Sequence, residues 1–329
     1  MLKVIPLQQY LKKPLTFNAL LVGKVIKSTG SHYTVKNEKG EYIQALIKGK
    51  LRLKASKNTN PIAVGDKVEL QLQDDNTYGI MNVLPRKNYI IRRSTNLSKQ
   101  THVIAANLDQ AIILITLKDP YTPLGFIDRF LLTAEAYHIR TILLFNKWDN
   151  YNEEEKQVAQ NLMNIYIKIG YECLPFSTLE PDIELLKSLL KNKTTLISGH
   201  SGVGKSSLIN ILEPGLNLKT GKVSDYHKKG THTTTFYEMF DLSFGGEIID
   251  SPGIKGFGVV EIDKNEVSHY FPEMRKYLPE CKFNNCLHID EPKCAIKEKV
   301  ESGEIAFHRY KNYLTIFYDR ETDHEEEFK

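Results

Sequence analysis

The stretch GHSGVGKSS, residues 199–207, decides the fold of this 329-residue chain. It matches the pattern G-x-x-x-x-G-K-[ST] and lies between a predicted strand, KTTLIS at 193–198, and a predicted helix, KSSLINIL at 205–212. In that context the glycines let backbone N–H groups converge on a phosphate at the positive end of the helix. We predict that Lys205 reaches the β- and γ-phosphates and serves catalysis, and that Ser206 ligates Mg²⁺. The predicted phosphate-binding residues are Gly199, His200, Ser201, Gly202, Val203, Gly204, Lys205, Ser206 and Ser207.

The tetrapeptide NKWD, residues 146–149, follows the predicted strand RTILLF at 140–145. Asp149 offers two acceptor oxygens that match the N1–H and exocyclic amino donors of guanine, a pair that adenine lacks. We expect Asn146 to join this site to the phosphate loop and the Lys147 stem to pack on the base. After the next predicted strand, a backbone N–H in the sequence FST can meet guanine O6. The predicted base-binding residues are Asn146, Lys147, Trp148, Asp149, Ser177 and Thr178.

The sequence DSPG, residues 250–253, follows a further predicted strand, GEIID at 246–250. Alone, such a sequence is a common turn. About forty-five residues after the Lys205–Ser206 pair, it is typical of a nucleotide site instead. We expect Asp250 to hold Mg²⁺ through water and the amide of Gly253 to contact the γ-phosphate.

The polar segment KKGTHTTT, residues 228–235, lies where a nucleotide-sensitive switch is expected. Thr234 is our first choice, and Thr233 our second, to complete the Mg²⁺ shell. Ile254 follows DSPG at a position where many GTPases have a water-orienting Gln, so we expect slow hydrolysis by the protein alone. His232 is the nearest substitute in a catalytic role, although a solvated loop residue or an RNA contact is the alternative.

These elements run in the order base recognition, phosphate loop, switch and DSPG, whereas the phosphate loop ordinarily comes first. We interpret this order as a circular permutation, which preserves the sheet when the original termini lie close together. As a result, the chain passes from DSPG almost directly into a cysteine-containing segment.

That segment, CKFNNCLHIDEPKC at 281–294, has the spacing C-x4-C-x-H-x5-C. Three thiolates and one imidazole form a closed tetrahedral shell, which predicts a single structural zinc ion. Free cysteines and a histidine that are close by chance are the alternative. The fourth cysteine, Cys173, lies in a predicted strand and is expected to be a core thiol. The predicted zinc ligands are Cys281, Cys286, His288 and Cys294.

The N-terminal third differs in pattern and in charge. Residues 18–84 contain short alternating runs with turn signals between them, which predicts a five-stranded OB-type barrel. Residues 1–100 carry 18 Lys and Arg against 6 Asp and Glu, whereas the whole chain has a net charge of +4. This asymmetry favours a polyanionic partner for the barrel, with a merely solubilising surface as the alternative. The basic segment 48–57 falls in one of the predicted barrel loops.

Composition indicates a soluble, cytoplasmic protein. The longest apolar run, AIILITL at 111–117, is too short to span a bilayer, and the N-terminus lacks the features of a signal peptide. From about Leu108 the pattern alternates between strands and helices, which predicts a largely parallel sheet covered by helices.

The chain closely resembles the ribosome small-subunit-dependent GTPase A family of circularly permuted GTPases. The matching stretches are NKWD, GHSGVGKSS, GTHTTT, DSPG and CKFNNCLHIDEPKC. The resemblance implies an OB-fold domain, GTP hydrolysis stimulated by the small ribosomal subunit, and a role in late maturation of that subunit. It also identifies the expected RNA partner as ribosomal. The family usually has Arg where this chain has Thr231, and Ser-Ala where it has Ser177 and Thr178.

We therefore predict a multidomain α/β protein. An OB-type RNA-binding barrel occupies residues 1–90, and a circularly permuted P-loop GTPase domain, with a mostly parallel sheet and helices on both faces, occupies 91–262. A helical zinc-binding module occupies 263–329. The expected partners are GTP or GDP and the small ribosomal subunit with its rRNA, without a membrane, and we expect a monomer.

Two other classes of function remain to be weighed. One is an RNA-binding assembly module whose nucleotide site is regulatory and hydrolyses GTP barely or not at all. The other is a P-loop kinase or ATPase, which NKWD disfavours. Lys205, Ser206, Asp149 and Asp250 are all present, and this favours the GTPase.

Overall fold

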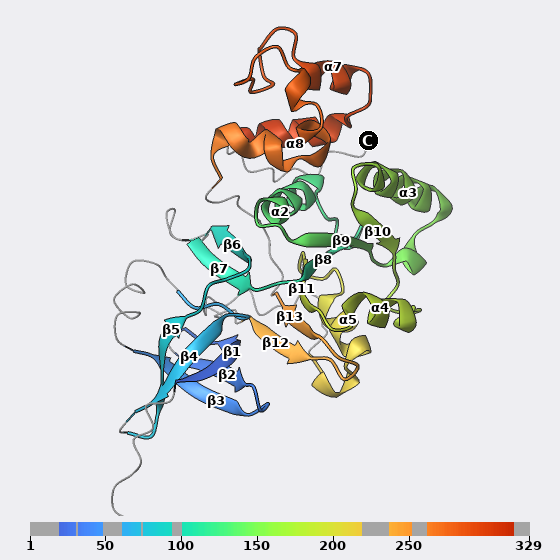
Figure 1. Cartoon of the computed structure of the whole chain (residues 1–329). Coiled ribbons are helices and arrows are strands. Elements are labelled where there is room, and N and C mark those ends of the chain that lie inside the picture. The colour runs from blue at the N-terminus through green and yellow to red at the C-terminus, as the bar shows by residue number, and fades with distance from the viewer. Residues whose placement is uncertain are drawn as a thin grey trace, which may run out of the picture.

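A computed structural model describes residues 20–30, 32–48, 61–73, 75–93, 101–218, 237–251 and 262–318. Figure 1 shows a barrel at one end, a central sheet with helices, and a helical C-terminal module at the other end. Within the described parts of the chain, no helix is long and apolar enough to cross a membrane.

The N-terminal region is a closed five-stranded barrel. Its strands are β1 (Leu21–Ser28), β2 (His32–Asn37), β3 (Tyr42–Ile47), β4 (Lys67–Leu72) and β5 (Tyr78–Val83). They pair in the order β1-β2-β3-β5-β4, and β4 returns to β1, with β3 and β5 parallel and the other pairs antiparallel. The predicted OB-type barrel is thereby confirmed. Alternate side chains point inward and form the core, which comprises Val25, Tyr33, Val35, Ala45, Ile62, Val68, Leu70 and Ile80.

The central sheet has the strand order β10-β9-β8-β11-β13-β12. Its strands are β8 (Gln110–Ile115), β9 (Arg140–Phe145), β10 (Glu172–Pro175), β11 (Thr194–Gly199), β12 (Glu238–Asp241) and β13 (Glu247–Asp250). All neighbours are parallel except β12 and β13, which form an antiparallel hairpin. This agrees with the predicted α/β class.

Helices cover both faces of this sheet, as the sequence predicts. They are α2 (Leu124–Ala136), α3 (Glu153–Lys168), α4 (Ile183–Leu190) and α5 (Lys205–Leu212). Ile113 and Ile115 of β8 pack in the core with α2 and α3, whereas Ile112 and Leu114 pack in the core with α4 and α5. Helix α3 begins with a capping box, in which Asn152 and Glu155 each bind the backbone N–H of the other.

A hairpin between the barrel and the sheet was not expected from the sequence. Strands β6 (Tyr89–Arg93) and β7 (Thr101–Ala106) pair antiparallel and form a separate two-stranded sheet. By sequence, residues 85–99, PRKNYIIRRSTNLSK, are only a basic stretch that leads out of the barrel. The two consecutive arginines interrupt the apolar alternation by which a short strand is found.

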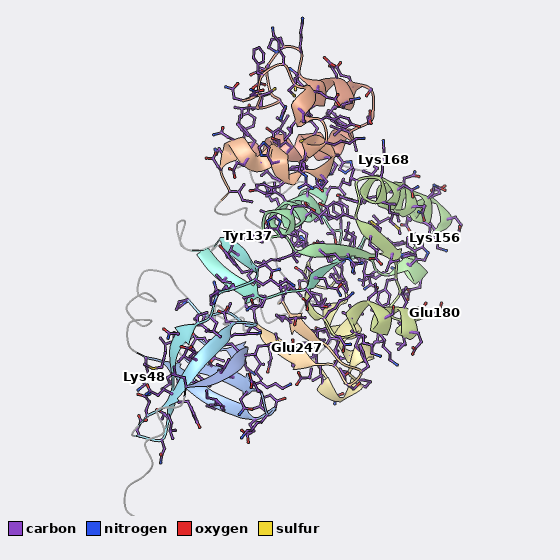
Figure 2. All side chains as sticks on the ribbon, in the orientation of Figure 1. Lys48, Tyr137, Lys156, Lys168, Glu180 and Glu247 are labelled. Carbon is purple, nitrogen blue, oxygen red and sulfur yellow. The ribbon has the colours of Figure 1, made fainter. Side chains whose placement is uncertain are left out.

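The barrel joins the central sheet edge to edge, so that one 11-stranded sheet results. Strand β1 pairs antiparallel with β12, where Lys27 lies opposite Glu238. Figure 2 shows Glu247 at this junction. Three ion pairs span it, Lys24–Glu247 at 2.7 Å, Lys27–Glu238 at 2.9 Å and Lys36–Asp241 at 2.7 Å.

The C-terminal module consists of short helices around a small apolar core. They are η5 (Lys264–Tyr270), α6 (Pro272–Arg275), η6 (Leu278–Glu280), α7 (Ala295–Glu301) and α8 (Phe307–Phe317). This core includes Leu132 of α2, so the module packs directly on the central domain. Beside it, the buried guanidinium of Arg309 lies 2.6 Å from Asp128 of α2 and 2.6 Å from Glu273 of α6.

Candidate nucleotide site and metal centre

The predicted nucleotide-binding segments meet at the carboxyl edge of the parallel sheet. In the strand register, Gly199 lies opposite Leu114 of β8, and Asp250 lies opposite Ile197 of β11. The tetrapeptide NKWD follows β9, and Ser177 follows β10. Because these strands are parallel, residues at their carboxyl ends share one edge, where ligands of open α/β sheets bind.

The phosphate loop runs from β11 into α5 with a backbone that requires glycine. Gly199 has a φ of 144° and Gly204 a φ of 105°. A Cβ on Gly204 would lie 2.3 Å from Nδ2 of Asn146. The Lys205 ammonium donates to the carbonyl oxygens of Gly199 and His200, each at 2.7 Å, and is therefore held inside the loop. Ser206 and Ser207 lie in the first turn of α5, half-buried.

Asn146 connects the base-recognition segment to this loop. Its side-chain Nδ2 donates to the carbonyl of Val203 at 2.6 Å, and the residue is fully buried. Asn146 therefore links the segment after β9 to the phosphate loop.

The residues predicted to bind the base include an exposed carboxylate, that of Asp149. Asp149 accepts a hydrogen bond from the hydroxyl of Ser177, which brings the segments after β9 and β10 together. The backbone N–H of Trp148 donates to the carbonyl of Phe176 at 3.0 Å. Lys147 has a φ of 65° and donates to the carbonyl of Asp119.

The remaining predicted residues lie around the phosphate loop. The Thr178 methyl group approaches Gly204, since it would lie 3.7 Å from a Cβ there. Ser201 and Gly202 are exposed, whereas Val203 is buried. The His200 ring packs on Phe126 of α2 at 4.2 Å, and burial beside Lys205 lowers the pKa of His200 to about 4, so the ring is neutral at pH 7.

The Lys205 ammonium and the Asp250 carboxyl influence each other electrostatically, and burial disfavours the ionised form of each. Burial raises the pKa of Asp250 to about 6, against the opposing effect of Lys205. Burial likewise lowers the pKa of Lys205 to about 8, against the effect of Asp250. Among the residues that the structure describes, none forms a hydrogen bond with the buried Oδ1 of Asp250. An orphaned carboxylate oxygen in this position fits a hydrated Mg²⁺ ion, which favours oxygen ligands.

Several predicted residues lie outside the described residues. They are His232, Thr234, the alternative Thr233, Gly253 and Ile254. Most of the basic segment 48–57 also lies outside them. Their predicted roles therefore stay predictions.

Two side chains that border the site were not predicted from the sequence. Phe126 packs on His200, and Tyr151 bonds through its hydroxyl to Asn146 and Leu117. Neither belongs to a nucleotide-binding motif. Tyr151 lies two residues after NKWD, and only the fold shows that its side chain returns to the strand ends.

The four predicted metal ligands converge in the C-terminal module. Their ligand atoms all lie within 4.8 Å of one another. The sulfur atoms of Cys281 and Cys294 lie 3.6 and 3.4 Å from Nδ1 of His288. A tetrahedral zinc ion with ordinary bond lengths would separate such sulfur and nitrogen atoms by about 3.6 Å, so the group fits this metal.

The loop that carries His288 is fixed by hydrogen bonds to its backbone. The hydroxyls of Tyr310 and Tyr313 donate to the carbonyls of His288 and Leu287, each at 2.6 Å. The Glu291 carboxylate accepts from the N–H groups of Leu287 and Ile289. Because α8 supplies both tyrosines, the loop that carries His288 is held by the same helix that packs on the central domain.

Together, the OB-type barrel, the parallel sheet with its phosphate loop, and the base-recognition segment earlier in the chain define a circularly permuted P-loop GTPase fold. Comparison with known proteins agrees. Residues 83–260 match the family described as RsgA GTPase, and residues 22–80 match the RsgA N-terminal domain.

Relatives and solved structures cover almost the whole chain. A protein of Flavobacterium psychrophilum named small ribosomal subunit biogenesis GTPase RsgA is 55% identical over 90% of this chain and 92% of its own length. The protein of that name in Christiangramia forsetii is 53% identical over 92% and 97%. YjeQ from Thermotoga maritima has a TM-score of 0.71 and 35% identity, over 92% of this chain and 98% of its own. YloQ, described as a circularly permuted GTPase, has a TM-score of 0.67 and 28% identity, over 93% and 97%. The chain belongs to the RsgA GTPase family.

Proposed function

We propose that the protein is a GTPase that acts in the biogenesis of the small ribosomal subunit and hydrolyses GTP when that subunit stimulates it. The observation that carries this proposal is the convergence of Asn146, Asp149, Lys205 and Asp250 on one edge of the sheet. The relatives named for this role cover nearly the whole chain, which supports the same function here.

In this proposal, Asp149 binds the donor edge of guanine and the phosphate loop holds the phosphates. Lys205 leaves its carbonyl partners to meet the β- and γ-phosphates, and Ser206, Thr234 and Asp250 hold Mg²⁺, directly or through water. The amide of Gly253 contacts the γ-phosphate. When bound, Mg²⁺ would neutralise negative charge on the phosphates.

His232 is proposed to orient the attacking water once the subunit orders its segment. His232→Ala should then keep GTP affinity and slow intrinsic turnover while it loses most of the subunit-stimulated hydrolysis, about 10²–10⁴-fold. Full stimulation of this variant would assign water positioning to another group.

The C-terminal group is proposed to hold one structural zinc ion, and the barrel to contact ribosomal RNA mainly through phosphates. We place the domain boundaries near residues 90 and 262, and we expect a monomer in the cytoplasm. Lys24, Lys27 and Lys36 are already paired with carboxylates at the barrel junction. The RNA contacts are therefore expected from the other basic residues of the barrel.

GTP turnover measured with and without purified small subunits tests the proposal most directly. We expect slow release of phosphate by the protein alone and a large increase with subunits. Subunit binding without any increase would favour the alternative of an assembly module with a regulatory nucleotide site.

A further inference from the structure

The hydroxyl of Tyr151 occupies an unusual place between the ends of strands β8 and β9. The strands pair in parallel with Ile115 opposite Phe145, and the N–H of Asn146 donates to the carbonyl of Ile115 at 2.8 Å. In a parallel ladder the next hydrogen bond would join the N–H of Leu117 to the carbonyl of Asn146. Instead, the Tyr151 hydroxyl accepts from Leu117 at 2.8 Å and donates to Asn146 at 2.8 Å.

The Tyr151 hydroxyl separates the segments that follow β8 and β9 where each leaves the sheet. One continues into residues 116–122, which are closed by a hydrogen bond of 2.9 Å from the N–H of Thr122 to the carbonyl of Thr116. The other continues into NKWD, and Lys147 donates back to Asp119 in the first loop. Tyr151 therefore spaces these loops where they leave the sheet, and Lys147 also joins them.

Asn146 links the Tyr151 hydroxyl to the phosphate loop and to the segment that carries Asp149. Its backbone carbonyl is the acceptor for Tyr151, while its side chain donates to Val203 in the phosphate loop at 2.6 Å. Asp149 lies only three residues farther along the chain. A shift of the Asn146 backbone would therefore move the base-recognition carboxylate relative to the phosphate loop.

The environment keeps this hydroxyl protonated and in place. Tyr151 is 4% exposed, and its ring packs edge to face with Trp148 at 6.0 Å. Burial raises the pKa of Tyr151 to about 12, so it remains a hydrogen-bond donor throughout the physiological range.

We propose that Tyr151 is a positioning residue for guanine nucleotides, which aims Asp149 at the base by holding apart the loops that follow β8 and β9. This inference rests on the proposed GTPase function. It concerns the selectivity of the site and not only its stability.

The test is Tyr151→Phe in the full-length protein, with affinities for GDP and IDP measured by calorimetry. IDP lacks the exocyclic amino group that Asp149 is expected to bind. The variant leaves the buried Leu117 N–H and Asn146 carbonyl unsatisfied, so we expect GDP to bind about tenfold more weakly. We also expect the preference for GDP over IDP to shrink, because Asp149 is no longer aimed at that amino group.

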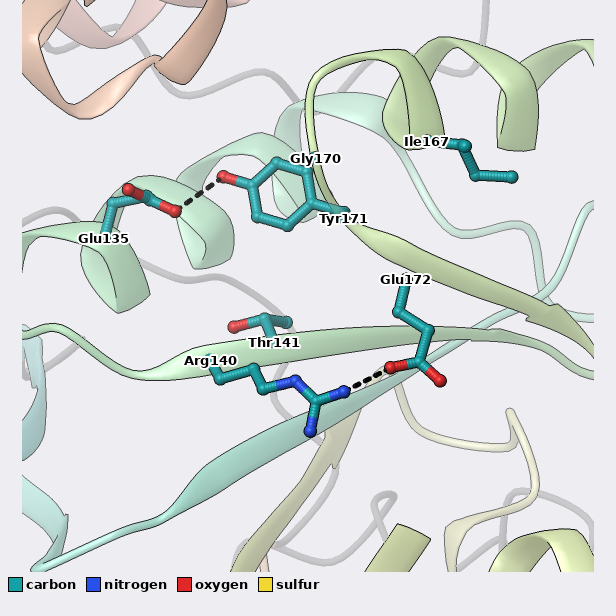
Figure 3. A pocket seen from close by; sticks show the side chains of 7 residues that line it. All are labelled: Glu135, Arg140, Thr141, Ile167, Gly170, Tyr171 and Glu172. Carbon is teal, nitrogen blue, oxygen red and sulfur yellow. Dashed lines mark hydrogen bonds and ion pairs between the residues drawn. The ribbon is translucent and has the colours of Figure 1, made fainter.

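Tyr171→Phe is the matched control. Tyr171 is a buried tyrosine of the same domain, but it borders a polar cavity of about 450 Å³ at the opposite, amino edge of the sheet. Figure 3 shows its hydroxyl directed toward Glu135, at 3.3 Å. This variant should leave both affinities unchanged.

An equal loss of GDP and IDP affinity in Tyr151→Phe, or no loss of either, overturns the inference. A second measurement uses the wild type, in which the Leu117 amide should exchange slowly with solvent and more slowly still with GDP bound. Protection that GDP leaves unchanged also overturns it. A wild type that binds ADP as well as GDP would reject the proposed function itself, and with it this inference.

Discussion

Replacement of Arg309 should loosen the attachment of the C-terminal module to the central domain. The guanidinium donates to both oxygens of Glu273, at 2.6 and 3.2 Å, and to Asp128 at 2.6 Å. The side chains of Arg309, Asp128 and Glu273 are 2, 0 and 5% exposed. In Arg309→Met, two carboxylates would stay buried without their cation.

The free-energy cost of Arg309→Met depends on the hydrogen bonds that the two carboxylates retain. Asp128 keeps hydrogen bonds from Tyr166 at 2.7 Å and from Asn312 at 2.6 Å. Both carboxylate oxygens of Glu273, by contrast, accept their hydrogen bonds from Arg309. Breaking a buried ion pair by removal of one partner costs about 3–5 kcal/mol, and Glu273 places this case toward the upper end.

Amide hydrogen exchange measures this cost locally, which is necessary because a multidomain protein lacks a single two-state transition. Helices α2 and α8 should open more easily by about 3–5 kcal/mol, which accelerates exchange there by about a hundredfold to a few thousandfold. Peptides from the barrel should not change. Arg275→Met is the control, since Arg275 is half exposed and lies 3.4 Å from Glu135, a pair expected to contribute less than about 1 kcal/mol.

A second variant separates buried charge from lost packing. The triple change Arg309→Met, Asp128→Asn and Glu273→Gln removes all three charges at similar side-chain volume. It should recover much of the lost protection, because replacing a whole buried ion group is far less costly than breaking it. Unchanged exchange in Arg309→Met, or a triple variant as loose as the single one, would refute this reasoning.

Three further predictions concern the base, the metal and pH. Asp149→Asn should weaken GTP binding and admit xanthine nucleotides, whose donor and acceptor pattern is reversed at this edge; nucleotide competition would show it, and unaltered selectivity would contradict it. Cys286→Ser should abolish stoichiometric zinc in elemental analysis and unfold the C-terminal module while nucleotide binding survives, because such sites supply about 10–16 kcal/mol. Because the pKa of Asp250 is raised to about 6 in the folded protein, the folded state binds this proton more tightly than the unfolded state does. The resulting contribution to stability is lost as pH rises through about 6. In the nucleotide-free protein, the central domain of Asp250→Asn should therefore be more stable than that of wild type at pH 7, by up to about 3 kcal/mol, and equal to it near pH 4. Its unfolding can be followed by the fluorescence of Trp148, the only tryptophan, which lies in that domain; an equal difference at both pH values would disprove the argument.

Sequence patterns predicted those parts of the molecule that neighbouring residues and the order of strands are enough to define. The phosphate loop, NKWD and the cysteine spacing each carry their chemistry in consecutive or regularly spaced residues, and the alternation of strands and helices placed them on one edge. Tyr151 and Arg309 were not predicted because each has a partner that is distant in the sequence, Leu117 for Tyr151 and Asp128 for Arg309. The contact between Arg309 and Asp128 joins residues 181 positions apart, and no period in the sequence connects them. The β6–β7 hairpin was not predicted although its contacts are local, because its apolar alternation is too short and too interrupted by charged residues to indicate strands.

The permuted order determines how the two flanking units are attached to the nucleotide site. The β12–β13 hairpin follows the segment expected to form the switch and runs into DSPG, since Asp250 ends β13. It pairs with the phosphate-loop strand on one side and with the barrel on the other. Beyond DSPG the chain enters the C-terminal module, whose helix α8 is fixed to α2 through Arg309. Removal of the barrel would therefore uncover the edge of β12 and leave Glu238, Asp241 and Glu247 without their lysines. A truncated protein would change the nucleotide domain as well as RNA binding, so substitutions on the barrel surface away from β12 are the sharper way to separate the two.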